Sequence, residues 1–149
     1  KFTYQNNKSF NKIDIDKRFV DIAGTHLHVF FVCDDGHVYG YGSNGYGRLC
    51  LPKKQNKFKG VSSFTQISYL NHLDIVAAFA GDSHSLFITK DGKVYSCGNN
   101  YHGQLLLNDS YSLTVINEGA TFCIAGDYFS AVFVGGGPPP NSPNMPVHY

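Results

Sequence analysis

The stretch AGDSHSLFITKDGKVYSCGNNYHGQL, residues 80–105, decides the fold because close copies of it recur along the chain. An earlier copy, AGTHLHVFFVCDDGHVYGYGSNGYGRL, occupies residues 23–49, and a third begins as AGDYFSAVFV at residues 125–134 and then breaks off. Each complete copy holds a glycine, an apolar run, an Asp-Gly turn, a Val-Tyr step and a Gly/Asn-rich turn. A unit repeated in this way predicts a repeat architecture, in which one packing solution is used several times.

Short antiparallel strands explain the pattern inside each copy. Asp35-Gly36 and Asp91-Gly92 lie between apolar runs, and Asp-Gly between such runs is a strong hairpin signal because both residues tolerate positive φ. The segments at residues 10–15 and 64–68 both begin with Phe, two polar residues and Ile, an alternation that is typical of a half-buried strand. Each copy is therefore predicted to form four short strands, and no helix of ordinary length is expected.

The spacing of the copies predicts propeller blades. Gly24, Gly81 and Gly126 are equivalent, which gives periods of 57 (81 − 24) and 45 (126 − 81) residues. Four strands at a period near fifty are typical of a β-propeller blade. The predicted fold is all-β, an incomplete array of about two and a half blades of four antiparallel strands. The predicted boundaries are a repeat fragment at 1–134, with units at 10–60, 64–110 and 111–134, and a Gly/Pro-rich flexible tail or docking peptide at 135–149.

Composition narrows the function classes. The formal net charge of +1 provides no bulk field to attract nucleic acid, so nucleic-acid binding is not expected outside a local patch. No run of 18 apolar residues occurs, so a membrane span is not expected. The chain opens on Lys1 without a signal peptide, which favours a segment of a longer protein with an intracellular, cytoplasmic or nuclear location.

Four cysteines occur, at positions 33, 50, 97 and 123, and no two form a Cys-x-x-Cys pair. Three of them lie in apolar strand-like runs, which favours buried, reduced thiols in an intracellular protein. A disulfide pair stays open as the alternative, because sequence does not fix connectivity.

The second copy resembles the repeats of the regulator of chromosome condensation family. The matching residues are Ala80-Gly81, Ser83-His84-Ser85-Leu86, Thr89, Asp91-Gly92, Val94-Tyr95-Ser96, Gly98, Asn100 and Gly103-Gln104-Leu105. The first copy matches at His28, Asp35-Gly36, Val38-Tyr39, Gly42, Asn44 and Gly47-Arg48-Leu49. The resemblance implies blades of a seven-bladed propeller. For some members of the family it also implies nucleotide exchange on a small Ran-type GTPase and chromatin association.

Several positions depart from the family pattern. Cys97 stands where the family usually has Trp, and Tyr41 takes that place in the first copy. Leu106 and Cys50 stand where a Gly is usual after Gln-Leu or Arg-Leu, and Phe129 replaces the repeated His.

His28 and His84 occupy equivalent positions, and a residue repeated once per blade is better explained by packing than by catalysis. The residues predicted to form the structural framework are Gly24, His28, Gly36, Gly81, His84, Gly92 and Gly98. The series Gly40–Gly45 spells G-x-G-x-x-G, but no helix follows to take a pyrophosphate, so it is interpreted as a turn. His26 and His28 lack further ligands at metal spacing. No catalytic residue, metal or cofactor is predicted, and the chain is not expected to be an enzyme.

The binding candidates lie in turns and in one basic run. The run supplies Lys53, Lys54, Lys57, Phe58 and Lys59, and the turns supply Tyr46, Arg48, Tyr101 and His102. The run is either a solvated loop or a patch for an acidic partner, and aromatic and Arg side chains are enriched at interfaces.

Fewer than three units cannot close a ring, so the chain is a fragment, an open stack or an assembly that associates through blade edges. The predicted function is a protein–protein interaction or scaffolding module with a protein partner. The alternative is all or part of an exchange factor for a small Ran-type GTPase with chromatin association.

Overall fold

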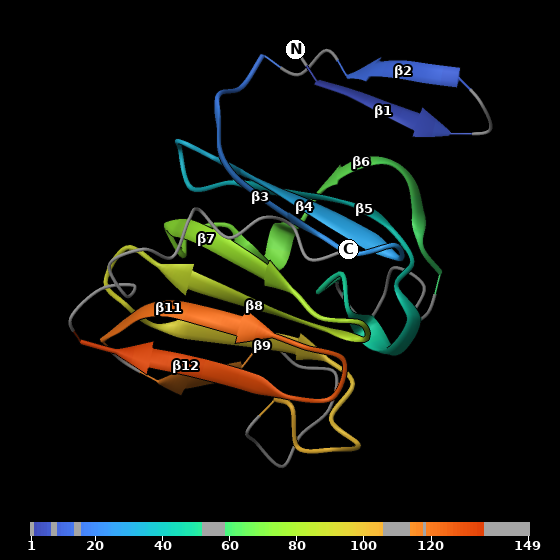
Figure 1. Cartoon of the computed structure of the whole chain (residues 1–149). Coiled ribbons are helices and arrows are strands. Elements are labelled where there is room, and N and C mark those ends of the chain that lie inside the picture. The colour runs from blue at the N-terminus through green and yellow to red at the C-terminus, as the bar shows by residue number, and fades with distance from the viewer. Residues whose placement is uncertain are drawn as a thin grey trace, which may run out of the picture.

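The computed structural model describes residues 2–6, 9–13, 16–51, 59–105, 114–117 and 119–135. Within these ranges the chain consists of antiparallel strands and two short 3₁₀ turns, which confirms the predicted all-β class. Figure 1 shows the strands as stacked sheets, with successive sheets following one another along the chain. No helix in the described part is long and apolar enough to cross a membrane.

Two complete four-stranded sheets form the centre, in the blade pattern that the sequence predicts. The first blade has the order β3-β4-β5-β6, with bounds Phe19–Gly24, His28–Cys33, Val38–Gly42 and Val61–Gln66. The second blade has the order β7-β8-β9-β10, with bounds Ile75–Ala80, His84–Thr89, Val94–Gly98 and Thr114–Asn117.

Two hairpins flank the blades. The N-terminal hairpin pairs β1 with β2, at Phe2–Asn6 and Ser9–Ile13. The C-terminal hairpin, called the half-blade below, pairs β11 with β12, at Ala120–Ala125 and Ser130–Val134. The 3₁₀ turns η1 and η2 lie at Gly45–Gly47 and Ser68–Leu70. The outer strand β6 hydrogen-bonds into the first blade, so the blade ends one strand later than the repeat unit predicted at 10–60.

The predicted Asp-Gly hairpins form as expected. Gly36 and Gly92 have φ values of 79° and 81°, the left-handed conformation that glycine adopts without a steric penalty. Their amides close the turns onto the carbonyls of Cys33 (3.0 Å) and Thr89 (2.9 Å). The extra residue in the first copy shifts the start of the blade, so that Gly24 pairs with Val29 where the second blade pairs Ala80 with Ser85.

Apolar side chains fill the spaces between successive sheets. The first junction, between the two blades, contains a large cluster: Phe30, Val32, Val38, Leu49, Cys50, Ile67, Leu70, Ile75, Ala78, Phe87 and Cys97. The second junction, between the second blade and the half-blade, contains a smaller one: Leu86, Ile88, Val94, Ala120 and Cys123. The side chains of β8 alternate between the two clusters, because neighbouring residues of a strand point to opposite faces.

Candidate binding surface and blade junctions

A buried histidine joins the first blade to the second. His28 Nε2 lies 2.9 Å from Ser85 Oγ, and Ser85 Oγ donates to the Arg48 carbonyl at 2.8 Å. Because the serine hydrogen is used on that carbonyl, Ser85 Oγ accepts from the Nε2–H of a neutral imidazole. Burial, with Arg48 nearby, lowers the pKa of His28 to about 3, so the neutral form is the one that fits.

The same arrangement recurs one blade later. His84 Nε2 lies 2.8 Å from Ser130 Oγ, which donates to the Gln104 carbonyl at 2.8 Å. Burial lowers the pKa of His84 to about 4. We call each set of His, Ser and carbonyl a junction relay. Both relays bridge two sheets, and His28 and His84 are buried, an arrangement that favours a structural role for both.

The third histidine position holds Phe129, whose ring packs over Gly126 as the ring of His84 packs over Gly81. A Cβ on either glycine would lie within 2.5 Å of the neighbouring ring, so both positions require glycine for space. Phe129 is 58% exposed, and a phenyl ring cannot make the relay hydrogen bond.

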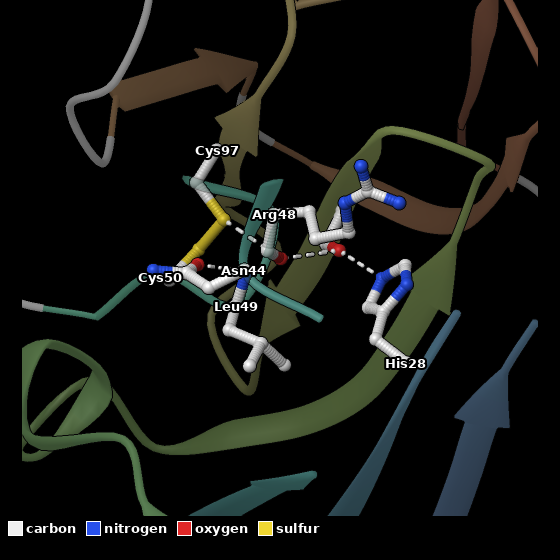
Figure 2. The surroundings of a disulfide bond; sticks show 7 residues. His28, Asn44, Arg48, Leu49, Cys50 and Cys97 are labelled. Atoms are coloured by element: carbon white, nitrogen blue, oxygen red, sulfur yellow. Dashed lines mark hydrogen bonds between the residues drawn. A yellow bond between two sulfur atoms is a disulfide. The ribbon is translucent and has the colours of Figure 1, made fainter. Parts of the chain in front are cut away.

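Cys50 and Cys97 form a disulfide between the blades, with their Cα atoms 5.6 Å apart (Figure 2). The favoured prediction of reduced thiols is therefore wrong for this pair, for which the alternative of a disulfide holds, while Cys33 and Cys123 are free and buried. The sequence separation of 47 residues places the two cysteines on neighbouring blades, a closeness that only the packing of one blade on the next creates. Both cysteines stand at positions where the family pattern has other residues.

Figure 2 shows that the disulfide lies next to the first relay. The Arg48 carbonyl oxygen, which accepts from Ser85, is 3.6 Å from Cys97 Sγ. The Arg48 guanidinium donates to the carbonyls of Gly45 and Asp82, both at 2.8 Å, and its carbon lies 5.9 Å from the Tyr46 ring centre. Arg48 is only 5% exposed, so this binding candidate holds the turn against the second blade and offers little surface to a partner.

Aromatic side chains gather where the turns of successive sheets meet. The Tyr46 and Tyr101 rings are 6.1 Å apart, and those of His102 and Tyr128 are 4.8 Å apart. Tyr46, Tyr101 and Tyr128 are 40%, 77% and 62% exposed. We call these four residues the turn surface. It brings together three of the predicted binding residues and adds Tyr128, which was not predicted because the equivalent residue of the second copy is Ser83.

The basic run falls mostly on positions that the structure does not describe. Lys53, Lys54, Lys57 and Phe58 are outside the described residues, and Lys59 is exposed. Among the described residues no group of three or more His, Cys, Asp or Glu side chains could hold a metal ion. The G-x-G-x-x-G series covers the end of β5 and the start of η1, so it does not open a helix of the dinucleotide-binding kind.

Comparisons with known proteins agree with this fold. The sequence models of the regulator of chromosome condensation (RCC1) repeat match residues 35–88 and residues 75–104. The chain is 37% identical over 86 residues to the human probable E3 ubiquitin-protein ligase HERC6, which covers 56% of this chain and 8% of that protein. It is 34% identical over 80 residues to Protein RCC1 of Candida albicans, which covers 52% of this chain and 17% of that protein.

Solved structures extend the likeness beyond the matched repeats. Prp20p of Saccharomyces cerevisiae superposes with a TM-score of 0.69 at 20% identity, over 83% of this chain and 32% of that one. Human WBSCR16 gives a TM-score of 0.72 at 20% identity, over 87% and 34%. Identities this low support the fold alone, and the chain spans less than a fifth of the two curated relatives. This chain carries a partial array of RCC1 repeats, folded as blades of a β-propeller.

Proposed function

We propose that the chain is a protein-recognition module that binds its partner through the turn surface. The observation that supports this is the row of exposed aromatic side chains across three successive sheets. Tyrosine gives a large contact area with little conformational entropy to lose, and it is enriched among residues that dominate binding energy. The two junction relays and the two apolar clusters hold the sheets together, and the turn surface is therefore carried by a rigid framework.

Proteins of related fold bind other proteins. Yeast Prp20p has binding properties to Gsp1p and histones, and a further solved structure shows Kap60 bound to it. For this chain a protein partner is a proposal, and so is an intracellular location. Asp127 precedes Tyr128 in the sequence, and the formal net charge of the chain is only +1, so a protein partner fits better than nucleic acid.

The test is the affinity for a captured partner of a Tyr46→Ala/Tyr101→Ala/Tyr128→Ala variant. We expect a loss of at least about tenfold, because removing buried interface tyrosines commonly costs more than about 1 kcal/mol each. Tyr69→Ala is the matched control, since Tyr69 is 45% exposed but lies in η2, away from the turn surface. Equal affinity of the triple variant and the control would contradict the proposal.

The basic run needs a separate variant. Lys53, Lys54, Lys57 and Lys59 changed together to Glu should abolish binding if the run contacts the partner. Unchanged binding would assign recognition to the turn surface alone.

Exchange-factor activity is the second candidate, favoured by the likeness to Protein RCC1. It predicts that the chain accelerates release of labelled GDP from a small Ran-type GTPase. A binding module that is not an exchange factor would bind without changing that release rate. Chromatin association predicts steeply salt-dependent binding to nucleosomes.

A further inference from the structure

The turn at residues 44–50 of the first blade has a close counterpart at residues 100–105 of the second. In each, the first Asn accepts the amide of the buried Leu at 2.9 Å, as Asn44 does from Leu49 and Asn100 from Leu105. In each, a Gly amide donates to the carbonyl of that Asn, at 2.9 Å and 3.0 Å. The two turns therefore share these two hydrogen bonds and differ in their other contacts.

Backbone conformation is the main difference. Tyr46 and Cys50 have φ values of 59° and 53°, the left-handed region that is costly for residues other than glycine. At the described positions of the second turn the only residue with positive φ is Gly103, which carries no such cost. Tyr46 is thus in an unfavourable conformation that its counterpart His102 avoids, whereas the counterpart of Cys50 lies outside the described residues.

The disulfide acts directly on one of these two residues. Cys50 is the residue at 53°, and its sulfur is bonded to Cys97 of β9 on the second blade. The Arg48 carbonyl, 3.6 Å from Cys97 Sγ, accepts from Ser85, and Tyr46 is two residues before Arg48 in the same turn. A covalent bond to the next blade can hold Cys50 in a conformation that hydrogen bonds alone would leave costly.

We infer that the Cys50–Cys97 disulfide is a redox-controlled lock on the first turn: oxidised, it holds the turn in the conformation that presents Tyr46; reduced, the turn relaxes. Reduction would thereby change the turn surface to which the proposed function assigns partner binding. The effect on partner affinity rests on the proposed function, whereas the effect on the turn itself does not.

The chemistry of release is thiol–disulfide exchange with a dithiol reductant. One thiolate of the dithiol attacks a sulfur of the pair, forming a mixed disulfide and releasing the other cysteine as a thiolate that takes up a proton. The second thiol of the reductant then displaces the remaining cysteine. Two electrons and two protons pass to Cys50 and Cys97, and the dithiol leaves as a cyclic disulfide.

Burial makes the lock slow to open. Cys50 and Cys97 are 4% and 2% exposed, so a reductant reaches the sulfurs only when the turn or the junction opens. At high reductant concentration the rate of reduction should therefore be limited by the rate of this opening, and adding more reductant should change it little.

Amide hydrogen exchange before and after treatment with dithiothreitol tests the inference. We expect the amides of Gly47, Leu49 and Cys50 to exchange at least about tenfold faster in the reduced chain. The matched amides of Gly103 and Leu105 in the second turn should change by less than about twofold. Equal acceleration in both turns would show general loosening, and no acceleration in the first turn would show that its hydrogen bonds suffice; either result overturns the inference.

Two double variants separate the backbone effect from loss of the crosslink. Cys50→Ser/Cys97→Ser should exchange as the reduced chain does. Cys50→Gly/Cys97→Ser places glycine, which tolerates positive φ, at position 50. The exchange rates of its first-turn amides should therefore stay within about threefold of those of the oxidised wild type. If the first-turn amides exchange as fast in the glycine variant as in the serine variant, relief of the positive-φ conformation of Cys50 does not explain the change, and the inference fails.

The affinity for the partner then links the lock to function. Reduction should weaken binding of the wild type and leave the glycine double variant unchanged. If exchange responds as expected and affinity does not, the lock exists but the turn surface is not the binding site, which contradicts the proposed function alone.

Discussion

The two junctions of this chain are built on one plan and reinforced differently. Both have a relay from a buried histidine through a serine to a main-chain carbonyl. The first junction adds a larger apolar cluster, the Arg48 hydrogen bond to the second blade and the disulfide. The shared parts are common to both junctions, and the added parts set the first junction apart from the second.

Removing one of the two buried phenyl rings of the first junction should have the largest effect. Phe87 is fully buried and its ring lies 4.9 Å from that of Phe30 across the junction. Phe87→Ala should lower the free energy of unfolding by about 3–5 kcal/mol, because a cavity replaces the ring. For comparison, Val132→Ala removes a smaller and only partly buried side chain from the second junction, and it should cost much less in chemical denaturation. Equal losses would contradict the difference between the junctions.

Loss of the disulfide should come next. Cys50→Ser/Cys97→Ser should lower the free energy of unfolding by roughly 2–4 kcal/mol, because the bond closes a long loop and restricts the unfolded chain. The measurement is urea unfolding with and without dithiothreitol. The wild type should respond to the reductant and the double variant should not. A response in the double variant would point to a different disulfide.

Acidification should weaken both junctions together. The pKa values of His28 and His84, about 3 and about 4 in the folded chain, lie below the ordinary value of 6.5. The unfolded chain therefore takes up protons first, so the stability from these residues is complete above pH 6.5 and declines as pH falls towards the folded values. At about pH 5 each histidine should cost about 2 kcal/mol relative to about pH 7.5. Thermal unfolding of His28→Gln and His84→Gln across this range measures it, and an unchanged pH dependence would place the titration elsewhere.

Changes to the turn surface should have the smallest effect on folding. Tyr101→Ala and Tyr128→Ala remove exposed rings, and each should shift the free energy of unfolding by less than about 0.5 kcal/mol. Their effect should appear in partner affinity. A large loss of stability would mean that these tyrosines stabilise the junctions, as the relay histidines His28 and His84 are expected to do.

The repeats made most of the fold predictable. Gly36 and Gly92 mark hairpins because an Asp-Gly turn leaves few alternatives. The recurrence of His28 at His84 predicted a structural role, which the two relays favour. Local spacing could not show that β6 closes the first blade, since the same alternating segment fits the end of one unit or the start of the next.

The candidate site was less predictable, because it depends on how one blade sits on another. Tyr46, Tyr101 and His102 were found from their place in turns, whereas Tyr128 needed the half-blade to be placed. Arg48 is of a residue type that is common at interfaces, yet its hydrogen bond to Asp82 on the next blade buries it. The departures from the repeat at Cys50 and Cys97 were visible in the sequence, but their pairing required three dimensions.

The most direct test of the covalent link between the blades is disulfide mapping of the purified, alkylated chain by peptide mass spectrometry without reduction. We predict one crosslinked peptide pair containing Cys50 and Cys97, with Cys33 and Cys123 recovered as alkylated free thiols. Four alkylated thiols, or a crosslink that includes Cys33 or Cys123, would contradict the claim that the two blades are covalently joined where they depart from the repeat.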